Sequence, residues 1–399
     1  FFQQCPGARI TPQEDLIVDD PVITGWHALP LRREPGDVAA LTVAAATKAL
    51  RSAGNPDPQL ILVANALGGP LQTQDNIRGQ AWLRDAGLGG AGVINIDNSC
   101  AGGSTALYTA DKLVRSGVET VLVIGVEQMT VGSTRATVDA IHRAMTPDDR
   151  QMYTAMAAGR GTPVMALNAR WAREYMTRHG LGDEVLVEAA VRAARLGAAN
   201  PVGVRTQPIT HEHAATSRLI NDPLRVEMCS GFADGAAAVV LSATGDGPRI
   251  TATTMVGGDG TGDYHSRVGD VAARLWTQLG VEARDADVVE LHDANASELL
   301  WATDVIGITA PGEAAGALTA GRLEPDGDLP AVNPSGGLLG RGHPIGATGV
   351  YQLVELAEQV SGLAGSRQRL GADLGALFNC GGIIGEDTAA AVGIAVAGG

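Results

Sequence analysis

Short apolar runs alternate with longer segments of helical hydrophobic spacing along this chain, and that alternation predicts an α/β fold. The first plausible strand is at residues 21–25 (PVITG), and a helix-like segment follows it over residues 37–54. The apolar run at residues 92–96 (GVINI) predicts a buried strand that leads into another helix-like segment. Two more helix-like segments, residues 166–180 and 181–200, lie in a region richer in arginine, methionine and histidine.

The pattern also repeats within the chain. Asp234 opens DGAAAVVLS and Asp387 opens DTAAAVGIA, while SCAGGSTALY around Cys100 aligns with GHPIGATGVY around His343. Cys100 precedes Asp234 by 134 residues, whereas His343 precedes Asp387 by 44, so the first copy carries 90 extra residues. Most of this surplus falls within residues 130–225. The sequence therefore predicts a duplicated α/β unit with an insertion in its first half.

Length and composition agree with two halves and an insertion. A chain of 399 residues with 45% hydrophobic content can bury a large core. The predicted segments are an N-terminal arm (1–20), a first half (21–247) that contains the insertion (about 130–225), and a second half (248–399).

Charge and cysteine content narrow the functional class. The net charge of −15 argues against nucleic-acid binding. No run of about 20 apolar residues is present, so no membrane span is expected. The N-terminus shows no signal-peptide pattern, and four cysteines do not make a disulfide framework, so we expect a soluble cytoplasmic protein.

Three reactive side chains are predicted at turns. Cys100 follows the run at 92–96 and precedes a helix, where the helix N-terminus favours a thiolate. His343 ends a glycine-rich loop before another helix, and Cys380 follows a strand-like run. Such glycines allow positive φ and close approach of the backbone to a ligand. Alone, a cysteine such as Cys100 is more often a buried core residue, but the three together favour an active site.

Six motifs occur in order: DNSCAGGSTAL, VIGVEQM, DPLRVEMCSGFADGAAAVVL, ELHDANASELL, NPSGGLLGRGHPIGATG and NCGG. Together they resemble the thiolase superfamily, most closely its sterol-carrier-protein-type (lipid-transfer-type) branch, from about residue 36 to the C-terminus. The resemblance implies a five-layer αβαβα fold made of two similar halves, with a loop domain inserted in the first. Residues 1–20 depart from the family and are expected to form an arm or a remodelled edge.

The resemblance implies thiolase-type acyl transfer, and the residue types suit that chemistry. Cys100 would be the acylated nucleophile, and His343 would be the base that takes its proton. Cys380 would exchange the α-proton of the incoming thioester, and His292 would join His343 in holding the thioester oxygen. The backbone N–H groups of Cys100 and Gly382 would form a second oxyanion pocket.

Coenzyme A is expected as part of the substrate and not as a tightly bound cofactor. The sequence has no phosphate-binding glycine loop of the P-loop or dinucleotide type. By resemblance, Ser230 would contact the pantetheine arm and Met165 would line the acyl pocket. The candidates for the nucleotide phosphates, each equally compatible with a solvated surface charge, are Arg225, Arg205 and Arg218.

No metal is expected, because His211 and His213 lack further ligand spacing and favour a solvated turn. Two positions depart from the family pattern. Asn295 replaces the phenylalanine that usually follows His-Asp-Ala, and Ile383 replaces the last glycine of Cys-x-Gly-Gly-Gly. We therefore expect Asn295 to place a polar wall in the acyl pocket, which suits a functionalised acyl group.

Assembly and two alternative functions complete the expectations. The apolar strands VLVIG and AAAVVL are expected to leave an open sheet edge, and the resemblance implies a homodimer or a dimer of dimers. One alternative is a retro-aldolase or C-acyltransferase that acts with a small OB-fold partner. The other is a non-catalytic scaffold that binds lipid or acyl-CoA.

Overall fold

The computed structural model describes residues 20–34, 36–88, 90–159 and 161–399. Apart from Asp20, the predicted N-terminal arm lies outside the described residues. The fold is mixed α/β, with two five-stranded halves that follow the same topology. The predicted fold class is therefore confirmed.

The first half contains strands in the order β1-β7-β4-β2-β3, in which β2 is parallel to both of its neighbours and β7 is antiparallel to both of its own. Its strands are β1 (Val22–Ala28), β2 (Leu60–Ala64), β3 (Gly92–Ile96), β4 (Thr120–Glu127) and β7 (Gly235–Ser242).

The second half repeats this arrangement in the order β8-β12-β11-β9-β10, with the same parallel and antiparallel pairs. A pairing of Val22 with Arg249 joins β1 to β8, so the two halves form one ten-stranded sheet. The strands are β8 (Arg249–Gly257), β9 (Val288–Leu291), β10 (Ala331–Val332), β11 (Leu374–Ile384) and β12 (Asp387–Ala397).

Two helices fill the space between the halves, α4 (Gly102–Arg115) and α14 (Thr348–Val360). Their N-terminal turns approach closely because glycine is present in both. A Cβ added to Gly349 would lie 2.3 Å from the backbone nitrogen of Ser104, and one added to Gly103 would lie 3.1 Å from the oxygen of Gly346. This approach brings together the loops that precede the two helices.

Outer helices complete the five layers. Helix α1 (Val38–Ser52) begins at Asp37, whose side chain accepts a hydrogen bond from Ala39 N–H, and its apolar face packs on the first half of the sheet. Helices α10 (Tyr264–Leu279) and α11 (Ala296–Val305) pack on the second half. Shorter helices are α2 (Gly68–Gln72), α3 (Arg78–Trp82), α12 (Ala314–Thr319) and α13 (Gly337–Arg341).

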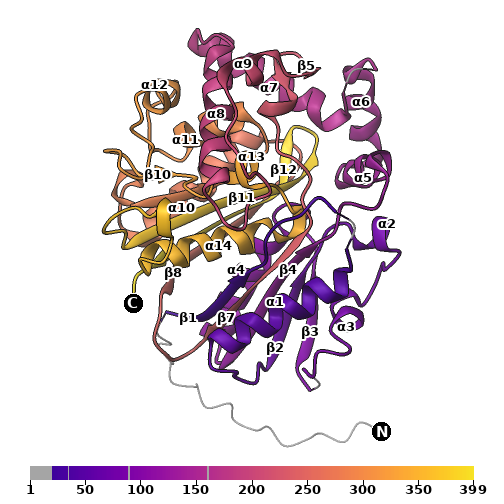
Figure 1. Cartoon of the computed structure of the whole chain (residues 1–399), viewed down its shortest axis with the longest axis vertical. Helices are drawn as coiled ribbons and strands as arrows, with labels where there is room; N and C mark the ends of the chain where they lie inside the picture. The colour runs from indigo at the N-terminus through magenta and orange to yellow at the C-terminus, as the bar shows by residue number, and fades with distance from the viewer. Residues whose placement is uncertain (1–19, 35, 89, 160) are drawn as a thin grey trace, which may run out of the picture.

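The segment predicted to be an insertion is mostly helical and covers one end of the sheet (Figure 1). Its longest helices, α7 and α8, occupy the two segments expected to be helical, and their hydrophobic faces join a large cluster with α10 and α11. The elements are α5 (Thr134–Ile141), α6 (Pro147–Ala157), α7 (Pro163–His179), α8 (Glu184–Ala198), α9 (His211–Thr216), β5 (Leu219–Asn221) and β6 (Leu224–Arg225).

Two expectations about strand burial are wrong. The run at residues 92–96 forms β3, but this strand lies at the sheet edge and not in the core, and its Ile94 is 38% exposed. The runs VLVIG and AAAVVL form β4 and β7, which are interior strands. An apolar run does not reveal its place in a sheet, because that place depends on which strands pair with it.

None of the helices in the described part of the chain is both long and apolar enough to cross a bilayer.

Candidate active site

Cys100 stands on the turn that leads from β3 to α4. The preceding Ser99 has a φ of +50°, a left-handed conformation that turns the chain sharply before the helix. Gly381 of β11 packs against this turn, because a Cβ there would lie 2.7 Å from the nitrogen of Cys100. The Cys100 thiol is partly exposed and lines a large cavity.

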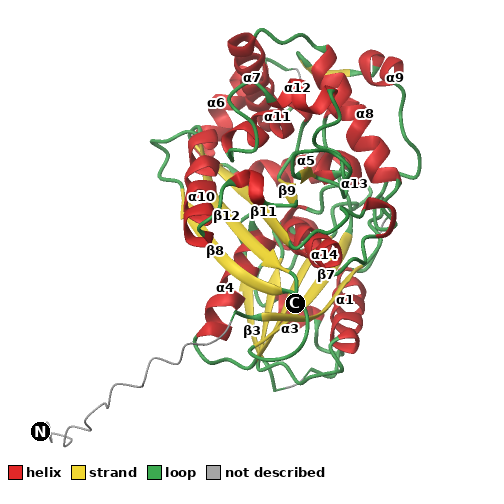
Figure 2. Ribbon diagram, turned by 90° about the vertical axis from the view of Figure 1, so that its left-hand side faces the viewer, coloured by secondary structure: helices red, strands yellow, loops and turns green. Residues whose placement is uncertain are grey.

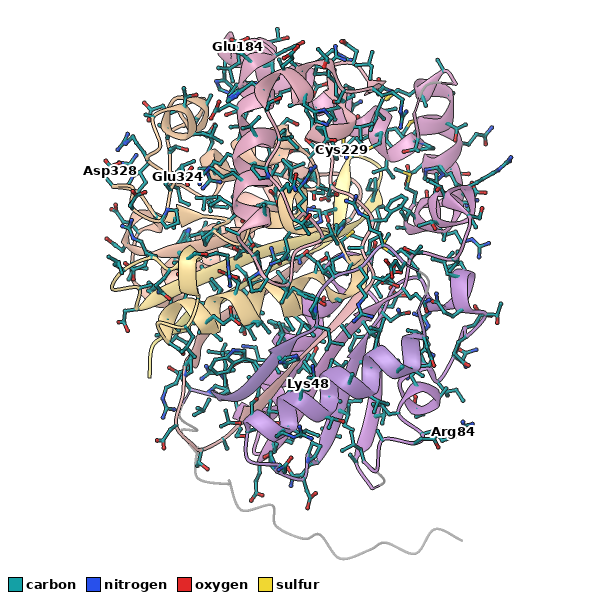
Figure 3. The ribbon with its side chains drawn as sticks, viewed as in Figure 1. Lys48, Arg84, Glu184, Cys229, Glu324 and Asp328 are labelled. Atoms are coloured by element: carbon teal, nitrogen blue, oxygen red, sulfur yellow. The ribbon has the colours of Figure 1, made fainter. Side chains whose placement is uncertain are left out.

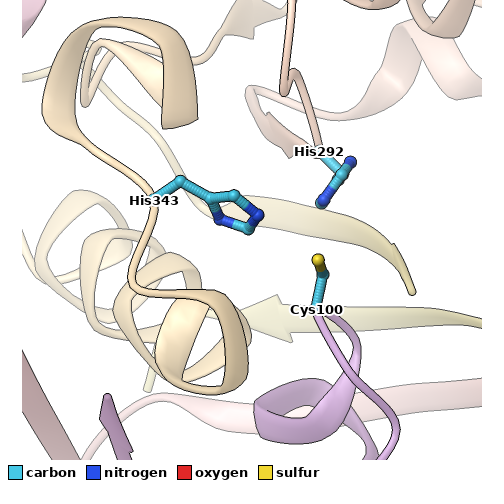
Figure 4. Close-up of side chains that lie close together, drawn as sticks. All are labelled: Cys100, His292 and His343. Atoms are coloured by element: carbon cyan, nitrogen blue, oxygen red, sulfur yellow. The ribbon is translucent and has the colours of Figure 1, made fainter. Parts of the chain in front are cut away.

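His343 enters the same cavity from the loop between α13 and α14 (Figure 4). Its Nδ1 lies 2.8 Å from Oγ1 of Thr348, whose hydroxyl donates to the carbonyl of Pro344. Because that hydroxyl has only one proton, it accepts from Nδ1–H and leaves Nε2 as a proton acceptor. Burial, the positive charge of a protonated His292 and the guanidinium of Arg341 lower the pKa of His343 well below its usual value.

His292 follows β9 and faces His343, with ring centroids 5.3 Å apart and planes at 84°. Its Nδ1 lies 2.9 Å from Oε1 of Glu298, and Nε2 makes no regular hydrogen bond within the described residues. Burial opposes the charged imidazole, but attraction to Cys380 and Glu298 raises the pKa of His292 well above its usual value. His292 therefore presents an N–H donor to the cavity.

The reactive atoms lie close together. Sγ of Cys100 and one ring nitrogen each of His292 and His343 lie within 4.8 Å of one another. Figure 4 shows the thiol of Cys100 pointing toward both rings. Cys380 lies on β11 within the same distance of His292 and Glu298. Burial raises the pKa of the Cys380 thiol, although His292 opposes this shift.

The cavity has a volume of about 750 Å³ and brings together most of the residues that the sequence indicated. Gly382 also lines the cavity. Its φ is +72°, and it is skipped in the residue pairing between β11 and β12. The predicted site residues on its wall are Cys100, His292, His343, Cys380, Gly382, Ser230 and Met165.

Arg225 lies elsewhere. Its guanidinium donates to the carbonyl of Ser217 and lines a neighbouring cavity beside α8 and α12. Arg205 and Arg218 do line the site cavity, and Arg205 pairs with Glu227. The spacing of the three arginines in the sequence could not show which of them face the cavity, because the fold of this segment sets the direction of each side chain.

The expected polar wall at Asn295 is also wrong. Asn295 is 3% exposed and is the N-cap of α11, where its Oδ1 accepts from the N–H groups of Ser297 and Glu298. The signal was present in the sequence, since asparagine followed three residues later by glutamate is typical of a helix start. The wall is mostly apolar instead, and its apolar residues include Met145, Val164, Met165, Trp171, Phe232 and Ile383.

Two cavity residues were missed by the sequence analysis. Glu298 lies beneath His292, and its position three residues after the N-cap could have indicated a role near the helix start. Tyr264 is the first residue of α10, and its hydroxyl reaches Glu298 and Cys380. No motif marks Tyr264, because 116 residues separate it from Cys380.

Comparisons with known proteins agree with this geometry. Residues 38–207 match the family model described as the N-terminal domain of thiolase, and residues 265–393 match a thiolase C-terminal domain-like model. The chain is 32% identical to an acetyl-CoA acetyltransferase of Methanothermobacter thermautotrophicus, over 82% of this chain and 86% of that protein. It is 30% identical to the benzoylsuccinyl-CoA thiolase subunit BbsB of Thauera aromatica, over 85% of this chain and 88% of that one.

Sterol carrier protein 2 of Gallus gallus is 30% identical over 84% of this chain, and the match spans 64% of that longer protein. Among solved structures, the Ltp2-ChsH2(DUF35) aldolase has a TM-score of 0.78 at 22% identity, covering 96% of this chain and 99% of that one. Human mitochondrial 3-ketoacyl-CoA thiolase in complex with CoA has a TM-score of 0.71 at 15% identity, with the same coverage.

Proposed function

The chain belongs to the thiolase family and is an acyltransferase of that type, and from this premise we propose that it works through an acyl-cysteine at Cys100. The reaction makes or cleaves a carbon–carbon bond between acyl-CoA thioesters. One observation carries the proposal: a partly exposed thiol, two imidazoles and a second thiol converge in one cavity.

Acylation uses Cys100 and His343. Nε2 of His343 takes the thiol proton, the sulfur attacks the thioester carbonyl, and the departing coenzyme A thiolate takes that proton back from His343. A low pKa keeps His343 neutral and able to accept the proton near neutral pH. The backbone N–H groups of Cys100 and Gly382 would hold the oxyanion of this step, which is supported by their position on the cavity wall.

Carbon–carbon bond formation uses His292 and Cys380. Cys380 removes a proton from the α-carbon of the second thioester, and the electron pair moves to the thioester oxygen. Nε2–H of His292 donates to that oxygen and stabilises the enolate. The expected help of His343 would need a proton on its Nε2, which the tautomer set by Thr348 leaves as an acceptor. The enolate then attacks the acyl group on Cys100 and releases its thiolate, which takes up the proton that Cys380 removed, so Cys100 returns to a thiol and Cys380 to a thiolate.

The coenzyme A arm enters past the insertion. Ser230 and Met165 lie on the cavity wall, which supports their assignment to the pantetheine arm and the acyl pocket. Arg205 and Arg218 replace Arg225 as the residues proposed for the nucleotide phosphates, because both border this cavity. The mostly apolar wall supports an apolar acyl group in place of the functionalised group expected from Asn295.

We also propose a homodimer formed through β3, since this edge strand leaves its outer side unpaired among the described strands.

The described cysteines, Cys100, Cys229 and Cys380, are free thiols, which supports a reducing cytoplasm. Cys229, labelled in Figure 3, is buried, and this burial raises the pKa of its thiol to about 12.

A retro-aldolase that acts with a small OB-fold partner is the second candidate. It is favoured by the fold shared with the Ltp2-ChsH2(DUF35) aldolase. Such an enzyme would cleave a β-hydroxyacyl thioester without an acyl-cysteine. The presence of both cysteines and both histidines in the cavity favours acyl transfer.

Mass spectrometry of the intact protein mixed with acetyl-CoA and longer acyl-CoAs tests the proposal. We expect one acyl group per chain at Cys100, no adduct in Cys100→Ala, and a normal adduct in the control Ser116→Ala at the far end of α4. Full thiolytic activity in Cys100→Ala would contradict the assignment. Retro-aldol cleavage without an adduct would favour the second candidate, and absence of both reactions would indicate a non-catalytic scaffold.

A further inference from the structure

Tyr264 lies between Cys380 and Glu298, the carboxylate that contacts His292. Its hydroxyl lies 2.8 Å from Oε1 of Glu298 and within hydrogen-bond distance of Sγ of Cys380. The ring is buried against Trp171 and Trp301, with centroids 5.0 Å and 5.5 Å away. This packing fixes the ring, so the hydroxyl hydrogen is the only part of Tyr264 that can change direction freely.

One hydroxyl proton faces two acceptors. A carboxylate at Glu298 accepts it whenever Cys380 is a thiol, and the S–H of Cys380 can then donate to the phenol oxygen. When Cys380 is a thiolate, both acceptors are charged, and the sulfur competes for the proton because Glu298 already accepts from His292 and Ala294. Glu298 stays satisfied in both states, since His292 Nδ1 and the N–H of Ala294 each lie 2.9 Å from its oxygens.

We propose that Tyr264 is a positioning residue for the α-proton step, because its hydroxyl turns from Glu298 to Cys380 and stabilises the Cys380 thiolate. This inference rests on the proposed function, since it assigns a role within the same site. It concerns only carbanion formation and leaves acylation of Cys100 unaffected.

The step is balanced without any added reactant. The C–H bond at the α-carbon breaks, the S–H bond of Cys380 forms, and the electron pair goes to the enolate oxygen near His292. The Tyr264 proton is not transferred; it turns back to Glu298 as Cys380 becomes neutral. The groups that face Cys380 are His292, Glu298 and Tyr264, with Cys100 across the cavity next to His292. Of these, His292 and Tyr264 lower the pKa of Cys380, whereas burial and Glu298 raise it.

The test separates α-proton exchange from acylation in Tyr264→Phe. Exchange of the acetyl-CoA methyl protons is followed by NMR in D₂O across a range of pH, and acylation of Cys100 is followed by intact mass. We expect exchange at neutral pH to fall about 10- to 100-fold and its pH midpoint to rise, because a hydrogen bond to the thiolate is lost. Acylation is expected to stay within about twofold of wild type.

Tyr175→Phe is the matched control. Tyr175 is also a buried tyrosine whose hydroxyl donates to a carboxylate, Asp304, but it lies outside the site cavity. We expect this control to leave both reactions unchanged. A second variant, 3-fluorotyrosine at position 264, keeps the ring and makes the hydroxyl a stronger donor, so the exchange midpoint should move to lower pH.

The outcomes separate the two proposals. Wild-type exchange in Tyr264→Phe, equal loss of exchange and acylation, or an unmoved midpoint with fluorotyrosine would each overturn the role of Tyr264. Failure of the wild-type protein itself to acylate Cys100 or to exchange α-protons would instead overturn the proposed function, and the role of Tyr264 with it.

Discussion

The two halves share one topology but contribute differently to the site. The first half supplies a single reactive side chain, Cys100, which is partly exposed at the end of an edge strand. The second half supplies His292, His343 and Cys380, all of them buried. Burial and neighbouring charges shift the pKa values of these groups. Under the proposed function, the second half would perform the proton chemistry and the first half would carry the acyl group.

The sheet edges differ in the same way. In the first half the edge strand β3 has five residues, and Ile94 is 38% exposed. In the second half the equivalent strand β10 has two residues, and both are buried. A short covered edge does not recruit another strand, whereas a longer exposed one does. The comparison supports the proposed assembly through the first half.

The largest effects are expected when one proton-transfer group is removed at a time, which tests the different roles of the two halves. We expect His343→Ala to reduce acylation of Cys100 by about 100-fold or more, because the thiol loses its base. Cys380→Ser should still acylate but lose exchange at the α-carbon of acetyl-CoA. Intact mass and NMR measure the two steps separately. Equal loss of both steps in Cys380→Ser would sink this division of labour.

A smaller effect is expected when the support of His343 is changed. Thr348→Val removes the hydroxyl that accepts from Nδ1–H and keeps the side-chain volume. Acylation should fall about tenfold, because the tautomer with a free Nε2 is no longer favoured.

The low pKa of His343 also predicts that wild-type acylation persists as the pH falls through 6.5, the usual value. An acid limb centred at or above that pH would show that His343 is not the buried neutral base.

The edge comparison can be sharpened with Ile94→Lys. This substitution places a charge on the exposed face of β3, which should weaken a β3-mediated dimer by about tenfold or more. Sedimentation over a range of concentrations measures the change. Leu370→Lys is the control, because Leu370 is 88% exposed but lies outside every described strand. A stable wild-type monomer at micromolar concentration would rule out the proposed dimer.

The smallest expected effect concerns Asn295. Because Asn295 caps α11, Asn295→Ala should lower the free energy of unfolding by about 1 kcal/mol. Selectivity among acyl-CoAs of different chain length and polarity should stay the same. Denaturation curves and a panel of acyl-CoAs check the two parts. Altered selectivity with unchanged stability would return Asn295 to the acyl pocket.

The sequence by itself determined the duplicated α/β fold and the candidate reactive residues. Local signals carried this information: apolar runs for strands and helical spacing for α7 and α8. The motifs around Cys100 and His343 are short, so their local structure depends mainly on neighbouring residues. The same local logic, applied to the N-terminal turn of α11, would have identified Asn295 as a cap.

Only the tertiary structure decided which residues meet across the chain. Strand order placed β3 at the edge although its sequence resembles a core strand, and the fold of the insertion turned Arg225 away from the cavity. Tyr264 joined Cys380 and Glu298 through contacts that no motif records. The pKa shifts of His292 and His343 also depend on burial and on contacts distant in sequence, with Cys380 and with each other. Such contacts depend on the packing of whole layers, which local sequence patterns do not specify.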